Sequence, residues 1–204
     1  MSAFQQFEEI SPSTLTNQWQ SPPLFNSDLV LHGTRYLEVL RQMTLKSVPV
    51  DLNGDLSLRL KMCGWIGANI HKVNCILQAL LEDCQACFYP FERPLVQIFA
   101  APLAAPLGLD GVCNILSQPI TLLIDTGRIL PEDWLGAVVH EYAHAVVASP
   151  GHDARFRQVV THLCLGLGLL PPPSGELGEL ESWPPCRANP NPQGFWLGEI
   201  ALPV

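Results

Sequence analysis

The feature that most constrains the fold of this chain is a helix expected between Pro131 and Ser149. Pro131 suits the first helical position, and Glu132 and Asp133 complement the positive end of the helix dipole. At about 100° per residue, apolar residues collect on one side of this helix and two histidines stand on the opposite side. The apolar positions are Leu135, Val138, Tyr142, Ala145 and Val146. We therefore expect a helix with one side on the core and the other side at a site.

The polar side of this helix carries His140-Glu141-Tyr142-Ala143-His144, an HExxH pattern. Histidines four residues apart stand on one face of a helix and can bind the same zinc ion. Glu141 lies about 100° round from His140, beside the metal, where a carboxylate can take a proton from zinc-bound water. A shuffled chain of this composition would contain the pattern roughly once in a hundred cases, so the helical context is what gives it weight. These residues predict a Zn²⁺ cofactor with Glu141 as the catalytic base.

The third zinc ligand is predicted to be His152. A catalytic zinc takes three protein ligands and keeps one position open for water. Pro150 disfavours helical conformation at the preceding residue and Gly151 permits a sharp turn, so the chain can reverse just after the first helix. Asp153 can then cap a second helix that runs to about Leu167. This turn would direct His152 back at the first helix, and the alternative is a histidine on a surface loop.

The stretch from Val139 to Val160 resembles SprT-like and WLM-type minimal zinc-peptidase domains, in which HExxH is followed shortly by a histidine and a phenylalanine. The preceding segment, Ile120 to Asp133, is similar in texture to the same families. The resemblance implies an α+β, zincin-like fold with N-terminal helices, a small mixed sheet, and an active-site helix followed by another helix. It also implies a peptide or protein substrate, bound by strand addition to a strand near Thr121 to Thr126.

The same resemblance implies His140, His144 and His152 as zinc ligands and Glu141 as the general base of peptide-bond hydrolysis. Gluzincins in the strict sense use a glutamate as third ligand, and three glutamates are available for that role: Glu176, Glu179 and Glu181. Their setting is rich in proline and glycine, which favours His152. The alternative is that the chain is a non-catalytic protein with a zincin fold, which binds metal or a partner protein or acts as a maturation factor for that partner. In this alternative the proline-rich tail covers the cleft.

Two other cysteine-containing features are weighed against this site. SprT-like proteins often add two CxxC pairs and a basic DNA-binding region, whereas this chain has one pair, Cys84 and Cys87, so DNA-linked proteolysis is not implied. A structural or unpaired role is expected for these two cysteines, because free cysteine is among the most buried residue types. A sharper hypothesis concerns Cys186: beside Arg187, its thiolate could occupy the open zinc position.

Composition limits the partners. The net charge of -8 argues against a surface that neutralises nucleic-acid phosphates. No apolar run is long enough to span a bilayer. The N-terminal residues show no export signal and the seven cysteines are an odd number, so reduced thiols in a cytoplasmic compartment are expected. Nothing in the pattern indicates an oligomeric state.

Three segments are expected along the chain: a flexible leader at 1–26, a zincin-like domain at 27–170, and a tail rich in proline and glycine at 171–204 that is either mobile or extended over the body. Inside the domain, apolar periodicity predicts helices from Ser27 or Asp28 to about Leu45 and from Leu58 to about Leu81, and strands at Leu95–Ala100 and Ile120–Ile124. Gly64 and Gly67 mark points where the second helix either breaks or packs closely.

Overall fold

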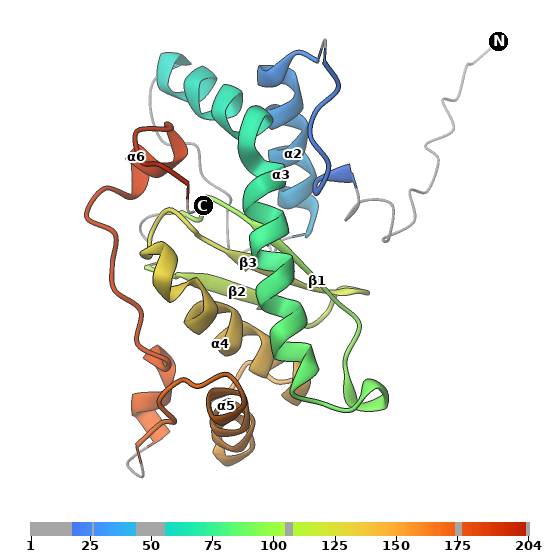
Figure 1. Cartoon of the computed structure of the whole chain (residues 1–204), viewed down its shortest axis with the longest axis vertical. Coiled ribbons are helices and arrows are strands. Elements are labelled where there is room, and N and C mark those ends of the chain that lie inside the picture. Colours follow the sequence, from blue (N-terminus) through green and yellow to red (C-terminus); the bar gives the residue numbers. More distant parts are fainter. Residues whose placement is uncertain (1–17, 26, 44–55, 105–107, 174–176, 203–204) are drawn as a thin grey trace, which may run out of the picture.

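The computed structural model describes residues 18–25, 27–43, 56–104, 108–173 and 177–202. The elements in these ranges are α2 (Leu29–Met43), α3 (Leu56–Ala86), β1 (Val96–Ala100), β2 (Gly111–Asn114), β3 (Ile120–Ile124), α4 (Trp134–Val147), α5 (Ala154–Gly166) and α6 (Pro192–Trp196). The α+β class expected from the sequence is confirmed (Figure 1). Most of the expected leader lies outside the described residues. No described helix is long and apolar enough to cross a membrane.

The first two helices pack side by side through glycines. Asp28 caps α2, because its carboxylate accepts hydrogen bonds from the backbone N–H groups of the second and third residues that follow it, at 3.0 and 3.1 Å. A Cβ atom on Gly33 would collide with the carbonyl of Cys63, and one on Gly67 with the carbonyl of Leu29. Gly67 therefore allows close packing and does not break the helix. α3 runs unbroken for 31 residues, longer at both ends than predicted.

The sheet has the strand order β1-β3-β2. β3 is central: it pairs in parallel with β1 and antiparallel with β2, and every one of its residues is buried. The expectation that the strand near Thr121 to Thr126 adds a peptide strand is wrong, because hydrogen bonds to β1 and β2 already occupy both edges of β3. β2 forms an edge of the sheet, and the sequence did not predict it.

α3 and α4 pack against the sheet and against each other, and α5 packs on α4 (Figure 1). The core between these layers is built from fully buried side chains of each element, including Leu77, Phe99, Leu122, Val138 and Phe156. This packing places α4 beside the edge strand β2.

The C-terminal segment runs along α4 and then forms α6, which packs against α3 (Figure 1). Leu130 N–H donates to the carbonyl of Arg187 at 3.0 Å, and Asn189 N–H donates to the carbonyl of Arg128 at 2.7 Å. Trp196 is buried and donates its indole N–H to Asp125 at 3.1 Å. Residues 177–202 of the expected tail therefore lie against the body, but they are not extended throughout, because they contain a 3₁₀ helix at Leu177–Ser182 as well as α6.

Candidate metal site

α4 presents the residues of the HExxH pattern to a recess. A 3₁₀ turn at Pro131–Asp133 precedes the helix, and Ala148 ends it in the left-handed conformation, with φ 54°. Tyr142 is fully buried on the core side, as predicted. The other side is less open than expected, since Glu141 and His144 are each only 7% exposed. The site is therefore enclosed on more than one side.

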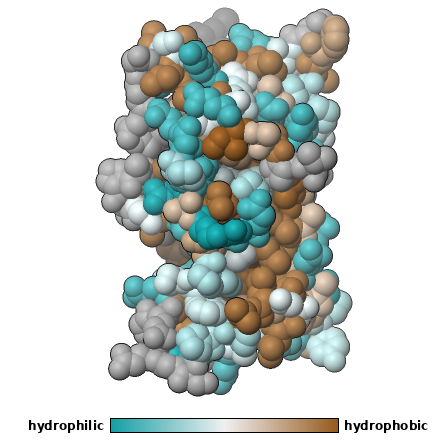
Figure 2. Space-filling model, turned by 60° about the vertical axis from the view of Figure 1, so that its left-hand side comes forward, coloured by the Kyte–Doolittle hydropathy of each residue, from teal (hydrophilic) through white to brown (hydrophobic). Residues whose placement is uncertain are grey.

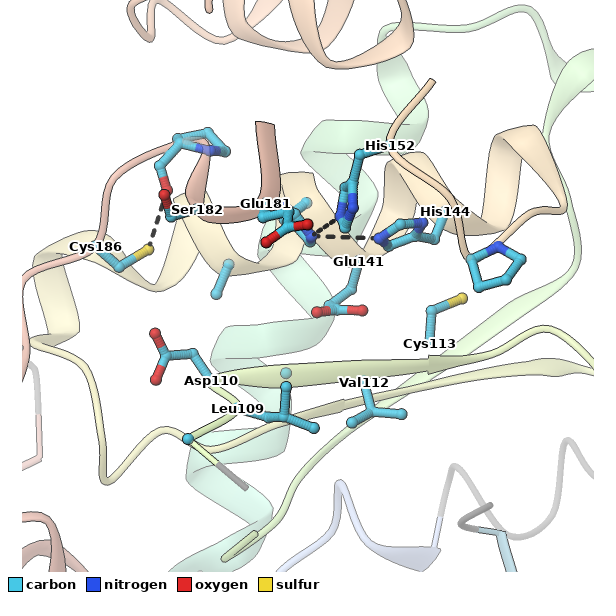
Figure 3. A pocket seen from close by; sticks show the side chains of 16 residues that line it. Leu109, Asp110, Val112, Cys113, Glu141, His144, His152, Glu181, Ser182 and Cys186 are labelled. Atoms are coloured by element: carbon cyan, nitrogen blue, oxygen red, sulfur yellow. Dashed lines mark hydrogen bonds between the residues drawn. The ribbon is translucent and has the colours of Figure 1, made fainter. Parts of the chain in front are cut away.

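The turn after α4 brings His152 back to the helix, as the sequence suggested. Asp153 caps α5 by accepting hydrogen bonds from the N–H groups of Arg155 and Phe156, at 2.9 and 3.0 Å. The ring of Phe156 packs against all three imidazoles, with centroid distances of 5.1 Å to His140, 4.5 Å to His144 and 4.8 Å to His152. The three histidines form a group that could hold a metal ion (Figure 3).

The Nε2 atoms of these histidines converge. His140 Nε2 lies 3.3 Å from His144 Nε2 and 3.1 Å from His152 Nε2. Nitrogen ligands about 2.0–2.1 Å from a tetrahedral zinc ion stand about 3.3 Å apart, so these separations match such a site.

Backbone carbonyls set the protonation of two of these rings. His140 Nδ1 lies 2.8 Å from the carbonyl oxygen of Trp183, and His144 Nδ1 lies 2.9 Å from that of Ser149. A carbonyl oxygen only accepts hydrogen bonds, so each Nδ1 carries the proton and each Nε2 carries a lone pair. Two lone pairs that face each other repel unless a cation lies between them. The residues present therefore fit a metal ion, since a histidine that binds metal commonly donates its other ring N–H to a backbone carbonyl.

Burial adjusts the ionisation of the same groups. It lowers the pKa of His140 to about 4, against a smaller opposite effect from the hydrogen bond to Trp183, and it also lowers the pKa of His144. Neutral imidazole is the form that binds metal. Burial, with a smaller contribution from the nearby charge of Asp110, raises the pKa of Glu141 to about 8. A bound cation would act in the opposite direction on this carboxyl group.

Glu141 lies between α4 and β2. A Cβ atom on Gly111, the first residue of β2, would stand 2.7 Å from Glu141 Oε1 and 2.8 Å from its Cγ. Glycine at this position makes the room that the carboxylate occupies. Within the described residues Glu141 has no hydrogen-bond partner, and its carboxylate faces the recess (Figure 3). The sequence offered no signal for this contact beyond the glycine itself.

The recess is a pocket of about 560 Å³ with three walls. β2 and the residues before it form one wall, the three histidines and Glu141 form the second, and the C-terminal segment forms the third. The third wall consists of Glu181, Ser182, Pro184 and Cys186. Figure 2 shows that hydrophobic side chains form a band on the face that carries this segment, bordered by hydrophilic ones. The first wall was not predicted from the sequence, whereas the third is the tail that one alternative places over the cleft.

The other candidate ligands stay outside the histidine group. Cys186 lines the pocket, but its Sγ lies 3.6 Å from the carbonyl oxygens of Asp133 and Pro184. Burial raises the pKa of Cys186 to about 11 and Arg187 pairs with Asp133, so neither observation supports the hypothesis that an arginine-stabilised thiolate of Cys186 occupies the open zinc position.

The remaining glutamates and cysteines add no ligand to this group. Glu181 lines the pocket outside the group, whereas Glu176 and the side chain of Glu179 are not described. Cys84 is buried at the end of α3 and Cys87 is half-buried, in keeping with a structural role.

Comparison with protein-family models, with curated proteins and with solved structures gave no match. The geometry of the pocket and the HExxH pattern are therefore the observations that bear on function.

Proposed function

We propose that this chain is a zinc-dependent metallopeptidase with a zincin-like fold. One observation carries the proposal: the Nε2 lone pairs of His140 and His144 converge with His152 in a pocket that also receives the buried carboxylate of Glu141. Three histidines and a separate carboxylate are the set that hydrolytic zinc sites use. Zinc, when bound, supplies Lewis-acid activation of water and of a carbonyl oxygen.

The residues of the chain have distinct roles in this proposal. Glu141 takes a proton from the attacking water and delivers it to the leaving amine. The carbonyls of Trp183 and Ser149 hold the two helix histidines in the tautomer that binds metal. The edge of β2 borders the pocket, so an extended substrate can pair with this strand in place of the occupied β3.

The test of this proposal combines metal content with activity. Wild-type protein is expected to bind one zinc ion per chain, and His152→Ala is expected to lose most of it. Glu141→Gln should keep zinc and lose peptide-bond hydrolysis by about a hundredfold or more. Absence of zinc from the wild type after reconstitution would contradict the metal site, and full activity in Glu141→Gln would contradict the mechanism.

A second candidate is a non-catalytic metal-binding or maturation factor, and the third wall of the pocket favours it. Ser182, Pro184 and Cys186 come from the C-terminal segment and narrow access to the histidines. Zinc-loaded protein that cleaves neither unfolded proteins nor short peptides would support this function. Cleavage that disappears in Glu141→Gln would support the peptidase.

A further inference from the structure

Trp183 faces inward where the C-terminal segment passes the histidines. Glu181, Ser182 and Pro185 beside it are exposed, whereas Trp183 is half-buried and packs against side chains of the core. Its backbone carbonyl accepts the hydrogen bond of His140 Nδ1 at 2.8 Å. Its indole has partners elsewhere in the fold, so this one residue connects the metal site to a second element.

The indole ring anchors Trp183 beside α5. Its Nε1–H donates to the carbonyl oxygen of Leu170, a few residues beyond the end of α5, at 3.2 Å. The ring also hydrogen-bonds with the thiol of Cys164, which is fully buried on α5. Burial raises the pKa of this thiol to about 11, against a smaller opposite effect of that hydrogen bond. The 3₁₀ helix at Leu177–Ser182 packs on α5 as well, so the residues just before Trp183 share this support (Figure 1).

Trp183 therefore joins the two helices that surround the histidines. It contacts α4 through its carbonyl and α5 through its indole. α5 also carries Phe156, whose ring packs against His140 with a centroid distance of 5.1 Å. The backbone N–H of Trp183 donates to the carbonyl of Leu180 at 3.2 Å, so this bond and the indole together hold the residue in place. The indole is the part of this support that depends on the type of residue at position 183.

We propose that Trp183 is a positioning residue of the metal site: its indole, anchored on α5, fixes its carbonyl oxygen on His140 and so keeps Nε2 of that ring without a proton. This inference rests on the metal site of the proposed function and does not depend on peptide cleavage. Without the anchor the carbonyl moves, and the proton of the neutral imidazole shifts in part from Nδ1 to Nε2. A ring protonated at Nε2 cannot bind metal through that nitrogen, so metal affinity falls.

Two substitutions of Trp183 test the anchor by degrees. Trp183→Phe keeps an aromatic ring and removes the indole N–H, whereas Trp183→Ala removes the whole side-chain anchor. We expect zinc affinity, measured by competition with a chelator, to fall about threefold in the first variant and about tenfold or more in the second. With cobalt(II) bound in place of zinc, Trp183→Ala should also show an altered visible absorption spectrum, which reports the arrangement of the ligands.

The tautomer of His140 is a readout that needs no metal. Long-range proton–nitrogen correlation NMR of metal-free protein at neutral pH should show Nε2 of His140 without a proton in the wild type. In Trp183→Ala the same nitrogen should be partly protonated.

Trp196→Phe is the matched control for Trp183→Phe. It also removes one indole N–H, which donates to the buried Asp125 at 3.1 Å, but Trp196 lies in α6, outside the pocket. Urea unfolding should show that Trp196→Phe destabilises the fold at least as much as Trp183→Phe does, because it removes a donor from a buried carboxyl group. Its zinc affinity and cobalt spectrum should match those of the wild type.

Wild-type zinc affinity and an unchanged His140 tautomer in Trp183→Ala would overturn the inference and leave the proposed metal site intact. Equal losses of zinc affinity in Trp183→Phe and Trp196→Phe would also overturn it, because they would reflect a general loss of stability. If Trp183→Ala does not fold, Trp183→Phe and its control decide between these outcomes. Absence of zinc from the reconstituted wild type would contradict the metal site and the inference together. Weaker zinc binding in the Trp183 variants of a protein that cleaves no peptide would support the inference and contradict the peptidase proposal.

Discussion

His140 Nδ1 lies 2.8 Å from the carbonyl oxygen of Trp183, a residue 43 positions later in the chain. This contact joins the helix of the HExxH pattern to the C-terminal segment. It fixes the proton on Nδ1 and leaves Nε2 to face the other histidines. The C-terminal segment is therefore part of the site that it covers.

Gly136 is the residue of α4 against which Pro184 and Cys186 of this segment pack. A Cβ atom there would stand 3.3 Å from Cys186 Sγ and 3.4 Å from Pro184 Cβ. We expect Gly136→Leu to push the segment away, to move the Trp183 carbonyl from His140, and to weaken zinc binding about tenfold or more. Competition with a chromophoric chelator measures the affinity.

Gly136→Ala is the control for this substitution, because alanine and leucine are both strong helix formers and alanine adds only the Cβ atom. Its zinc affinity should stay close to that of the wild type. Unchanged affinity in Gly136→Leu would show that the position of the segment does not influence the metal site.

The thiol of Cys186 lines the pocket without joining the histidine group. We expect Cys186→Ala to leave zinc affinity and peptidase activity within about twofold of the wild type, since the thiol contacts backbone carbonyls of Asp133 and Pro184. Chelator competition and peptide cleavage are the two measurements. A large gain of activity in the variant would mean that the thiol blocks the metal.

The carboxylate of Glu141 depends on the missing side chain at Gly111. Gly111→Ala places a methyl group 2.7 Å from Oε1 and 2.8 Å from Cγ, too close for either atom, so the carboxylate has to move while the three histidines stay in place. We expect kcat/KM to fall about a hundredfold, as for other small misplacements of catalytic groups, with zinc content unchanged.

Gly151→Ala serves as the matched control for Gly111→Ala. It alters a glycine near the same site, where the nearest atom to the added methyl group would be Ser149 Oγ at an ordinary 3.6 Å. Its kcat/KM should remain near that of the wild type. Equal losses in both variants would mean that crowding of Glu141 is not the cause.

Features set by local sequence were predictable. Asp153 caps α5 as expected, and Asp28, one of the two residues at which the first helix was expected to begin, caps α2, because capping needs only a side chain and the backbone a few residues on. The approach of His152 to the HExxH helix could be predicted because Pro150 disfavours a helical conformation at the residue before it and Gly151 permits a sharp turn.

Features set by long-range pairing were not predictable. β2 has four residues and includes Gly111 and Asn114, which are poor strand formers, so it shows no strand pattern. β3 is the central strand because the order in the sheet is β1-β3-β2, and the periodicity of apolar residues in a sequence does not reveal the order of strands. Trp183 contributes a backbone carbonyl to the site, and a backbone group has no residue type by which a sequence could reveal it.

Asp125 gives the fold a stability that depends on pH. Its buried carboxyl group accepts hydrogen bonds from Leu103 N–H at 2.9 Å, Gly127 N–H at 3.1 Å and the Trp196 indole at 3.1 Å. Burial outweighs these bonds and raises the pKa of Asp125 to about 6. In the unfolded chain an aspartate has a pKa of about 4, so between these values the folded state binds the proton more strongly.

Because the pKa of Asp125 is higher in the folded chain than in the unfolded chain, this residue stabilises the fold most at low pH. The contribution of Asp125 to the free energy of unfolding is fully present below about pH 4 and is lost as the pH rises through about 6, a loss on the order of 3 kcal/mol. In Asp125→Asn this loss is absent, and the amide instead carries a constant penalty because it offers one acceptor oxygen where the carboxyl group offers two. Urea unfolding of both proteins between pH 4 and pH 7 measures the difference, in which the contributions of the histidines cancel. The stability of the wild type should fall relative to that of the variant as the pH rises, whereas parallel curves would show that Asp125 ionises normally in the folded chain.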